Sequence, residues 1–342
     1  MKKVETVVRR ILFFIRLPAN TPTGVLLELH CCIKVRRMKN KILLTTVSTF
    51  FILHSAFGQG ALTPPGVPAP TMKTLAQIEP RTPISAAPFT ITQPGSYYLT
   101  TNVSASGNAI VITANGVSLD LGGWTISSTA TNATFGGSAI LLAGFLKNVT
   151  IQNGFIQGGV TNNGSGVFSG SGFGSGINYS VSPPVNVLVS KVSVSGCLIY
   201  GIALNIGEST VVESCTVRTI GTYGIYAATV KGCAAVDCGN KAIYGDQVSD
   251  CRGESFGAMG IHATMAQNCY GQCTSSGRGI FATTAHNCYG YCIGSGTGLE
   301  VTDIATGCRG ESNGVGLAAF IANSCHGIGT INLIVSHNVN SF

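Results

Sequence analysis

The chain has 342 residues, of which 45 are glycine and only 10% are charged. This composition, without a long apolar helical stripe, excludes coiled coils and helical bundles and favours short strands separated by tight turns. The formal net charge of +7 is concentrated in residues 1–58, which contribute about +8, so residues 59–342 are nearly neutral. A nearly neutral chain offers no electrostatic surface to nucleic acid, so we expect no nucleic-acid partner.

The N-terminal region has the pattern of a secretory signal peptide. A basic start at Met38 precedes the apolar run Ile42–Leu53, and small residues precede a cleavage point before Gln59. We therefore assign residues 38–58 to a signal peptide and residues 1–37 to an upstream extension from a mis-assigned start. The alternative for the extension is a longer leader or a membrane anchor. Export predicts a secreted or extracytoplasmic protein, at the cell surface or extracellular, with no transmembrane segment after cleavage.

A proline-rich segment follows the predicted cleavage point. Residues 59–88 contain seven of the twelve prolines of the chain. Such a composition is typical of a stiff, extended linker, which here would also serve as an N-terminal cap over the open edge of a sheet. We assign the remainder, residues 89–342, to a single repeat domain.

A repeat of about 18 residues occupies the C-terminal half. Seven cysteines follow one another at intervals of 18, 18, 18, 19, 20 and 17 residues, and we call them the cysteine ladder: Cys215, Cys233, Cys251, Cys269, Cys288, Cys308 and Cys325. Each follows a turn-forming residue that tolerates a left-handed backbone. A second apolar mark recurs in the same phase, as at Ile225 and Leu317. Two short strands and sharp bends per repeat describe one coil of a solenoid.

The same frame extends backward with larger apolar residues, as in Ile151–Ile156. The sequence therefore predicts an all-β parallel β-helix of about ten short coils, wide at its N-terminal end and narrow at its C-terminal end. Residues 127–137 and 157–184 are rich in Gly, Ser and Asn, and we expect them to leave the stack as loops. One more strand is predicted at Ile331–Val335.

The first coils also resemble a known group of proteins. The segments Phe89–Ile91, Pro94–Leu99 and Val117–Gly123 are similar to the opening of secreted bacterial right-handed parallel β-helix repeat proteins, in the pectate-lyase-like superfamily. The likeness covers roughly residues 71–342, and it implies a right-handed helix. Its motifs identify the fold well and the activity poorly.

The predicted mature chain holds eleven cysteines, so at least one thiol is unpaired. Ladder cysteines on adjacent coils would lie about 4.8 Å apart with parallel side chains, which suits a disulfide badly. We therefore expect buried thiols that fill a narrow core. The alternative is a set of bridges within coils: Cys233–Cys238, Cys269–Cys273 and Cys288–Cys292. The cysteines outside the ladder form a second set: Cys197, Cys238, Cys273 and Cys292. Regular C-x-x-C pairs and accompanying histidines are missing, so no metal site is predicted.

Outward positions on the C-terminal coils suggest a ligand surface. In a strand the residues beside the ladder should alternate with buried ones and stack between coils. The predicted binding residues are Arg252, Glu254, Tyr270, Tyr289, Tyr291, Arg309 and Glu311. Aromatic rings cover apolar sugar faces and charged groups bind hydroxyls or carboxylates, so the expected partner is a polysaccharide or cell-surface glycan, bound by a monomer. The plainer interpretation is that the rings pack and the charges solubilise the sheet.

A separate outward column is predicted to run through Tyr226, Tyr244, His262 and Phe281.

Evidence for catalysis is weaker, and enzyme activity is left open with no catalytic residue assigned. A glycosidase needs two carboxylates about 5–10 Å apart, whereas Glu254 and Glu311 would be three coils, or about 14 Å, apart. The signatures expected of enzymes with this fold are missing, and Asp120 is interpreted as structural. Two alternatives remain. One is a polysaccharide lyase or glycoside hydrolase built around the two predicted loops, the only case in which Ca²⁺ is expected. The other is a non-catalytic structural or adhesive surface protein.

Overall fold

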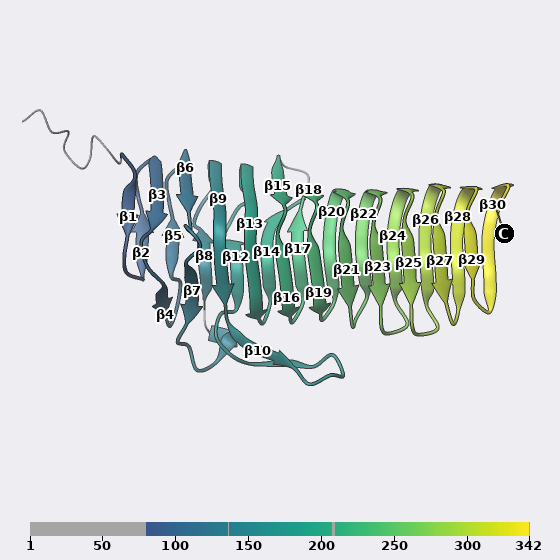
Figure 1. Ribbon diagram of the computed structural model, residues 1–342, viewed down its shortest axis with the longest axis horizontal. Coiled ribbons are helices and arrows are strands. Elements are labelled where there is room, and N and C mark those ends of the chain that lie inside the picture. The colour runs from purple at the N-terminus through teal and green to yellow at the C-terminus, as the bar shows by residue number, and fades with distance from the viewer. Residues whose placement is uncertain (1–79, 136, 207–208, 342) are drawn as a thin grey trace, which may run out of the picture. The chain divides into compact units, whose positions relative to one another are not determined.

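The computed structural model describes residues 80–341 except 136, 207 and 208, all within one compact unit that spans Met72–Phe342. These residues form a parallel β-solenoid of about 13 turns, about 19 residues apart, with nearly no helix (Figure 1). The predicted all-β parallel solenoid is confirmed, with more turns than expected. The predicted signal peptide, the upstream extension and most of the linker lie outside the described residues. Within residues 80–341 no helix is long and apolar enough to cross a membrane.

Twenty-eight strands form one continuous sheet that wraps around the stack as three flat faces, which we call A, B and C. Face A contains β2 (Phe89–Ile91), β5 (Ile110–Ile112), β8 (Ser138–Leu142), β12 (Ser175–Tyr179), β14 (Tyr200–Asn205), β17 (Tyr223–Ala227) and the first halves of β20 (Lys241–Ser249), β22 (Met259–Gln267), β24 (Arg278–His286), β26 (Thr297–Thr306), β28 (Val315–Asn323) and β30 (Ile331–Val339).

Face B holds β1 (Thr82–Ile84), β3 (Gly95–Leu99), β6 (Val117–Asp120), β15 (Thr210–Glu213), β18 (Thr229–Lys231), the first halves of β9 (Lys147–Gln157) and β13 (Val185–Cys197), and the second halves of β20, β22, β24, β26, β28 and β30. Face C holds β4 (Val103–Ala105), β7 (Thr125–Ser128), β16 (Thr216–Ile220), β19 (Ala234–Cys238), β21 (Arg252–Ser255), β23 (Tyr270–Cys273), β25 (Tyr289–Cys292), β27 (Arg309–Ser312), β29 (His326–Ile328) and the second halves of β9 and β13.

Both ends of the described stack extend the predicted boundaries. Strand β1 lies inside the segment assigned to the linker or cap, and it pairs with β3, so the described part of the stack already includes Thr82. The predicted final strand is confirmed and is longer than expected, because β30 continues to Val339.

A left-handed residue makes the corner between faces B and C in each C-terminal turn. The residue before every ladder cysteine has a φ between 50° and 62°: Ser214, Gly232, Asp250, Asn268, Asn287, Gly307 and Ser324. Glycine adopts this conformation without steric cost and Asn and Asp tolerate it, while Ser forms the weaker version of the same local turns, which explains why turn formers stand there. The predicted bends are confirmed.

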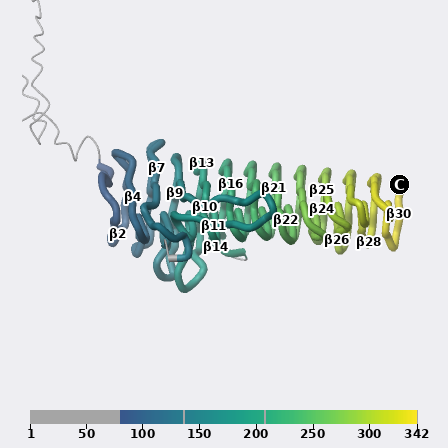
Figure 2. Tube along the Cα trace, turned by 90° about the horizontal axis from the view of Figure 1, so that it is seen from below, coloured from purple at the N-terminus to yellow at the C-terminus, as the bar shows by residue number. Residues whose placement is uncertain are grey.

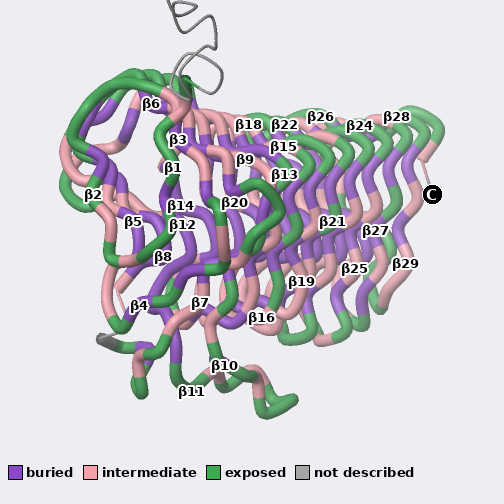
Figure 3. Tube along the Cα trace, turned by 60° about the vertical axis from the view of Figure 1, so that its left-hand side comes forward, coloured by how far each residue is buried: buried purple, intermediate pink, exposed green. Residues whose placement is uncertain are grey.

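Small residues become more frequent in the core along the stack. Fully buried isoleucines and leucines continue from Ile84 to Leu317, whereas alanine, cysteine and glycine fill more of the other buried positions in the later turns. Faces A and C approach so closely there that a Cβ atom on Gly271 would lie 2.3 Å from the carbonyl oxygen of Gly279. A Cβ on Gly290 would lie 2.1 Å from the oxygen of Gly298. Figure 3 shows buried residues in the successive turns of the stack, whereas the final strand β30 has none.

All eleven described cysteines are free and buried. The ladder is in register: the pairs Glu213↔Lys231 and Thr216↔Ala234 enclose its first two members. The bridges considered within coils do not form, because a strand separates their partners. Cys269 and Cys273 are joined by extended β23, about 13 Å at roughly 3.3 Å per residue, whereas a disulfide needs Cα atoms within about 7 Å.

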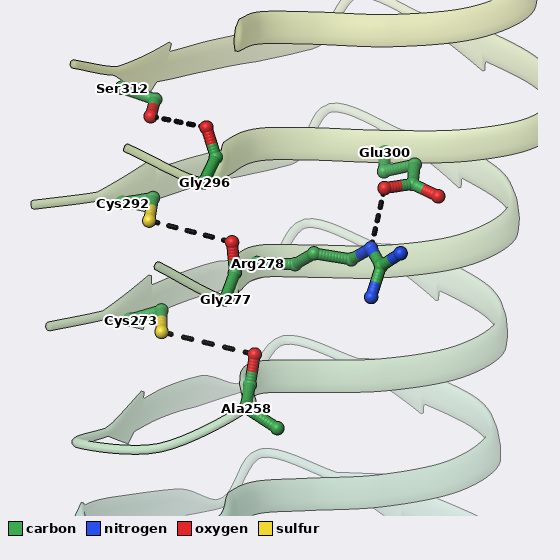
Figure 4. A network of polar contacts seen from close by, with 8 residues as sticks. All are labelled: Ala258, Cys273, Gly277, Arg278, Cys292, Gly296, Glu300 and Ser312. Atoms are coloured by element: carbon green, nitrogen blue, oxygen red, sulfur yellow. Dashed lines mark hydrogen bonds and ion pairs between the residues drawn. The ribbon is translucent and has the colours of Figure 1, made fainter. Parts of the chain in front are cut away.

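The remaining cysteines belong to a second column at the corner between faces C and A: Cys197, Ile220, Cys238, Ser255, Cys273, Cys292 and Ser312. Figure 4 shows what these side chains do. The thiol of Cys292 donates to the carbonyl of Gly277 at 3.5 Å, and the hydroxyl of Ser312 donates to that of Gly296 at 2.7 Å. Cysteine and serine therefore have the same role in this column: each donates a hydrogen bond to a carbonyl of the preceding turn.

The segments predicted to leave the stack as loops are more ordered than expected. Residues 127–137 include the end of β7 and a 3₁₀ turn, Ala133–Phe135. Residues 157–184 contain β12 of face A and a hairpin of β10 (Gly159–Asn162) and β11 (Phe168–Ser171). Glycines with positive φ, such as Gly164, make its turn.

The hairpin lies outside the main sheet with most of its residues exposed, and it runs along the stack (Figures 1 and 2). The Asn162 side chain donates to Asp237 Oδ1 at 2.6 Å, and the Phe168 ring meets the edge of Phe256 at 6.4 Å. These contacts join the hairpin to the region where faces C and A meet. Part of the segment 157–184 therefore leaves the main sheet, as expected, but as an ordered hairpin, while β12 of the same segment belongs to face A.

Candidate glycan-binding face

Face C carries the predicted binding residues because buried and outward positions alternate along its short strands. In β21, β23, β25 and β27 a glycine and a cysteine or serine point inward, and the residues between them point out. The outward residues form two neighbouring columns, which we call the arginine–tyrosine face: Arg252, Tyr270, Tyr289 and Arg309, beside Glu254, Gln272, Tyr291 and Glu311. The register brings together all seven residues singled out from the sequence, and it adds Gln272 as an eighth member.

The members of the arginine–tyrosine face hold one another in place. Arg309 pairs with Glu311 at 2.9 Å, and the Tyr289 hydroxyl donates to the same carboxylate at 2.8 Å. Arg252 pairs with Glu254. The two guanidinium groups lie over the neighbouring rings, at 5.5 Å from the centroid of Tyr270 and 5.1 Å from that of Tyr289. Such mutual support fixes the side chains before any ligand arrives.

The hydroxyls of Tyr270 and Tyr289 are hydrogen-bond donors at neutral pH. Burial and the Glu311 carboxylate raise the pKa of Tyr289 to about 12. Burial also raises the pKa of Tyr270, whose hydroxyl donates to Gln272 Oε1 at 2.7 Å. The two rings stand edge to face, 5.4 Å apart.

A shallow groove of about 840 Å³ runs beside this face, along the corner between faces B and C. Its lining combines corner residues, ladder cysteines and the first outward column: Ser214, Cys215, Thr216, Gly232, Cys233, Ala234, Asp250, Cys251, Arg252, Asn268, Cys269, Tyr270, Asn287 and Tyr289. Asn268 donates to Asp250 Oδ1 at 3.1 Å, so the polar side chains of the corner also bridge successive turns. The groove is thus continuous over several turns.

The second predicted column is on face A. Tyr226, Tyr244, His262 and Phe281 are in register, and their ring centroids are 5.0, 4.4 and 5.0 Å apart. The predicted column is confirmed.

The sequence reading missed the outward column beside it, which contains Tyr200, Tyr223 and Lys241. The Lys241 ammonium lies 2.9 Å from His262 Nδ1 and 4.1 Å from the centroid of the Tyr244 ring. These residues stand two positions before the apolar mark of each repeat, as in Tyr223-Gly-Ile, a signal that would have located them.

His262 should make stability depend on pH. Burial, with Lys241 and Arg278, lowers its pKa to about 4, whereas an unfolded histidine titrates near 6.5. Between these two pH values the unfolded chain binds more protons than the folded chain. The contribution of His262 to the free energy of unfolding is therefore fully present above pH 6.5 and is lost as the pH falls toward 4. Allowing for the exposed half of the ring, we expect a loss of about 1–2 kcal/mol.

Urea denaturation at pH 7 and pH 4.5 measures this effect. His262→Gln should flatten the difference between the two pH values. An equally steep loss in the variant and the wild type would contradict the assignment to His262.

The described acids do not form a recognised catalytic set. Glu254 and Glu311 lie three rungs apart, as predicted. Asp120 accepts from the Gly122 amide at 2.9 Å and pairs with Arg81 at 3.6 Å, contacts that suit a structural role. Among the residues that the structure describes, no group of three or more His, Cys, Asp or Glu side chains is placed to hold a metal ion.

One carboxylate that sequence reasoning passed over is Asp237. It has a left-handed φ of 58°, and its two oxygens accept from Asn162 of the hairpin at 2.6 Å and from Thr219 at 2.7 Å. Only the folded hairpin reveals this arrangement.

Comparison with known proteins adds little to this geometry. No protein-family profile matches the chain, and no curated protein matches it. A solved structure, the enzymatically active domain of tailspike protein 2 from bacteriophage CBA120, is similar over 73% of this chain at 14% sequence identity, with a TM-score of 0.32. The match covers 41% of that structure, so this chain spans less than half of its length. A likeness this distant carries no argument about activity, and membership of the pectate-lyase-like superfamily stays a prediction.

Proposed function

We propose that this chain is an exported, monomeric β-solenoid that binds a polysaccharide or cell-surface glycan through the arginine–tyrosine face. The observation that carries the proposal is the register of that face. Equivalent positions repeat at each rung, about 4.8 Å apart, which is close to the length of one pyranose unit in an extended polysaccharide. A polymer lying along the stack would therefore meet an aromatic or a polar side chain at every sugar.

The chemistry of the face suits hydroxyl-rich rings. Tyrosines supply apolar area with a polar tip, and arginine and glutamate supply directed donors and acceptors. Within each Arg–Glu pair the two charges cancel, so specificity would rest on hydrogen bonds and ring contacts rather than on net charge. Because the side chains already contact one another, little rotamer entropy is lost on binding.

A second candidate function is a polysaccharide lyase or hydrolase, and Asp237 is the observation that favours it. The hairpin residue Asn162 orients this carboxylate, and Glu254 stands on the neighbouring rung of the same face. Carboxylates placed on adjacent rungs meet the spacing that glycoside hydrolysis requires better than Glu254 with Glu311 does. This candidate is the case in which Ca²⁺ dependence is expected; the binding proposal includes no cofactor.

The test incubates the full chain with a panel of acidic and neutral polysaccharides, with and without Ca²⁺. Retention on immobilised polymer, absorbance of unsaturated products and new reducing ends are followed together. We expect retention without new ends, unchanged by Asp237→Asn and weakened by Tyr270→Ala.

Each other result decides between the remaining candidates. New chain ends that disappear with Asp237→Asn and survive Tyr270→Ala would establish an enzyme and overturn the binding proposal. If no polymer were retained or cleaved, the remaining candidate would be a non-catalytic structural or adhesive protein.

A further inference from the structure

The cysteine ladder is a regular column of thiols as well as a core filler. Each thiol donates to the carbonyl two residues earlier, at 3.3 Å for Cys233 and 3.0 Å for both Cys251 and Cys269. Each also faces a carbonyl of the preceding turn, at 3.5, 3.6 and 3.4 Å in the same order. Since the contacts repeat, the sulfur atoms repeat with the rungs, about 4.8 Å apart.

This spacing matches the span of two metal–sulfur bonds. A thiolate sulfur binds a first-row metal ion at about 2.3 Å, so an ion midway between two sulfurs in a straight line spans about 4.6 Å. The side chains of a ladder are parallel, and each sulfur has other sulfurs only above and below it. An ion in the column therefore meets two sulfurs and no third ligand, in agreement with the absence of larger metal-binding groups among the described residues.

Two-coordinate thiolate sites select soft ions. Zinc requires four ligands, and for that reason the cysteine spacing predicted no zinc site, but Cu(I) is a soft ion that thiolates favour. The ladder lies directly beneath the surface, because Cys215, Cys233, Cys251 and Cys269 line the shallow groove at the corner between faces B and C, although each is almost fully buried. An ion would therefore enter from this groove, on the side of the matching donor set.

We propose that the cysteine ladder binds soft metal ions, with Cu(I) as the ion to test, between pairs of neighbouring thiolates. Each Cu(I) displaces two thiol protons to solvent and forms two Cu–S bonds, which leaves a bis-thiolate of charge −1 with no change of oxidation state. Cys273 and Cys292 are neighbours in the second column and form one further pair. Cys197 and Cys238 have Ile220 or Ser255 as neighbours, and they bind no ion in this way.

The test compares two triple variants that remove equal numbers of thiols. In the alternating variant, Cys233→Ser, Cys269→Ser and Cys308→Ser leave no two ladder cysteines adjacent. In the block variant, Cys288→Ser, Cys308→Ser and Cys325→Ser leave four adjacent cysteines. Cu(I) is titrated into the reduced full chain against a chromogenic chelator under anaerobic conditions. From the pairs that remain, we expect about four ions for the wild type, about three for the block variant and about one for the alternating variant.

Equal stoichiometry in the two variants would show that thiol number rather than ladder geometry governs binding, and would overturn the proposal. X-ray absorption of the Cu(I)-loaded wild type needs no variant to fold. Two sulfur neighbours per copper support the proposal, and three or four would overturn it. Neither measurement involves the arginine–tyrosine face. The proposed function of that face is tested separately, by polysaccharide binding.

Discussion

Gly290→Ala is expected to destabilise the solenoid by about 3 kcal/mol or more, or to prevent folding. The added Cβ would lie 2.1 Å from the carbonyl oxygen of Gly298 and 2.7 Å from its carbon. Both atoms belong to the backbone of a paired strand, so no side chain can rotate away to relieve the overlap. Relief would require faces A and C to separate, which would break contacts in the turns above and below.

Thermal and urea denaturation followed by circular dichroism measures the effect. Gly107→Ala is the matched control, because no atom lies within 4 Å of its added Cβ and its φ is not positive. We expect that variant to unfold within about 0.5 kcal/mol of the wild type. If Gly290→Ala unfolded like the control, the close approach of the two faces would be disproved.

Tyr289→Ala should weaken polysaccharide binding by about thirtyfold, the effect of losing a central aromatic anchor. The ring lies in the middle of the arginine–tyrosine face, under the Arg309 guanidinium and beside Tyr270. Its hydroxyl also donates to Glu311, so the substitution frees both charged neighbours to move. Affinity measured by isothermal titration calorimetry, for whichever polymer retains the protein, gives the change.

Two further variants separate binding from stability. Tyr289→Phe keeps the ring and should lose much less affinity than Tyr289→Ala. Tyr244→Ala removes a tyrosine from face A, where it stacks on Tyr226 and His262, and should leave affinity nearly unchanged. An equal loss in Tyr244→Ala and Tyr289→Ala would move the binding surface away from face C.

Most of the fold could be predicted because its determinants are local and periodic. A turn former directly before each ladder cysteine sets the corner, and strand alternation then decides which side chains point outward. That is why Arg252, Tyr270 and Tyr289 could be placed in one column from spacing alone.

The irregular N-terminal turns were harder to count. Paired residues are 18 apart at Lys231↔Ser249 but 38 apart at Gln152↔Ser190, so a fixed period finds the later turns and misses earlier ones. The bridges considered within coils failed for a related reason. Spacing gives the distance between Cys269 and Cys273 along the chain, but not whether the residues between them are extended or bent.

Contacts between residues distant in the sequence could not be predicted, because no local sequence pattern indicates them. Asn162 and Asp237 are 75 residues apart, and neither lies in a motif that indicates the other. The docking of the hairpin depends on three-dimensional proximity, on an edge contact between Phe168 and Phe256, and on glycines that allow a tight turn. No periodicity reports such contacts.

The in-register stacking of turns has a consequence for how such a protein changes over time. Because each turn pairs only with the turns beside it, duplication of one whole repeat would insert a rung without altering the geometry of the others. The arginine–tyrosine face and the cysteine ladder would then lengthen together by the same step. A change in repeat number during evolution would therefore change the length of these surfaces while keeping their chemistry.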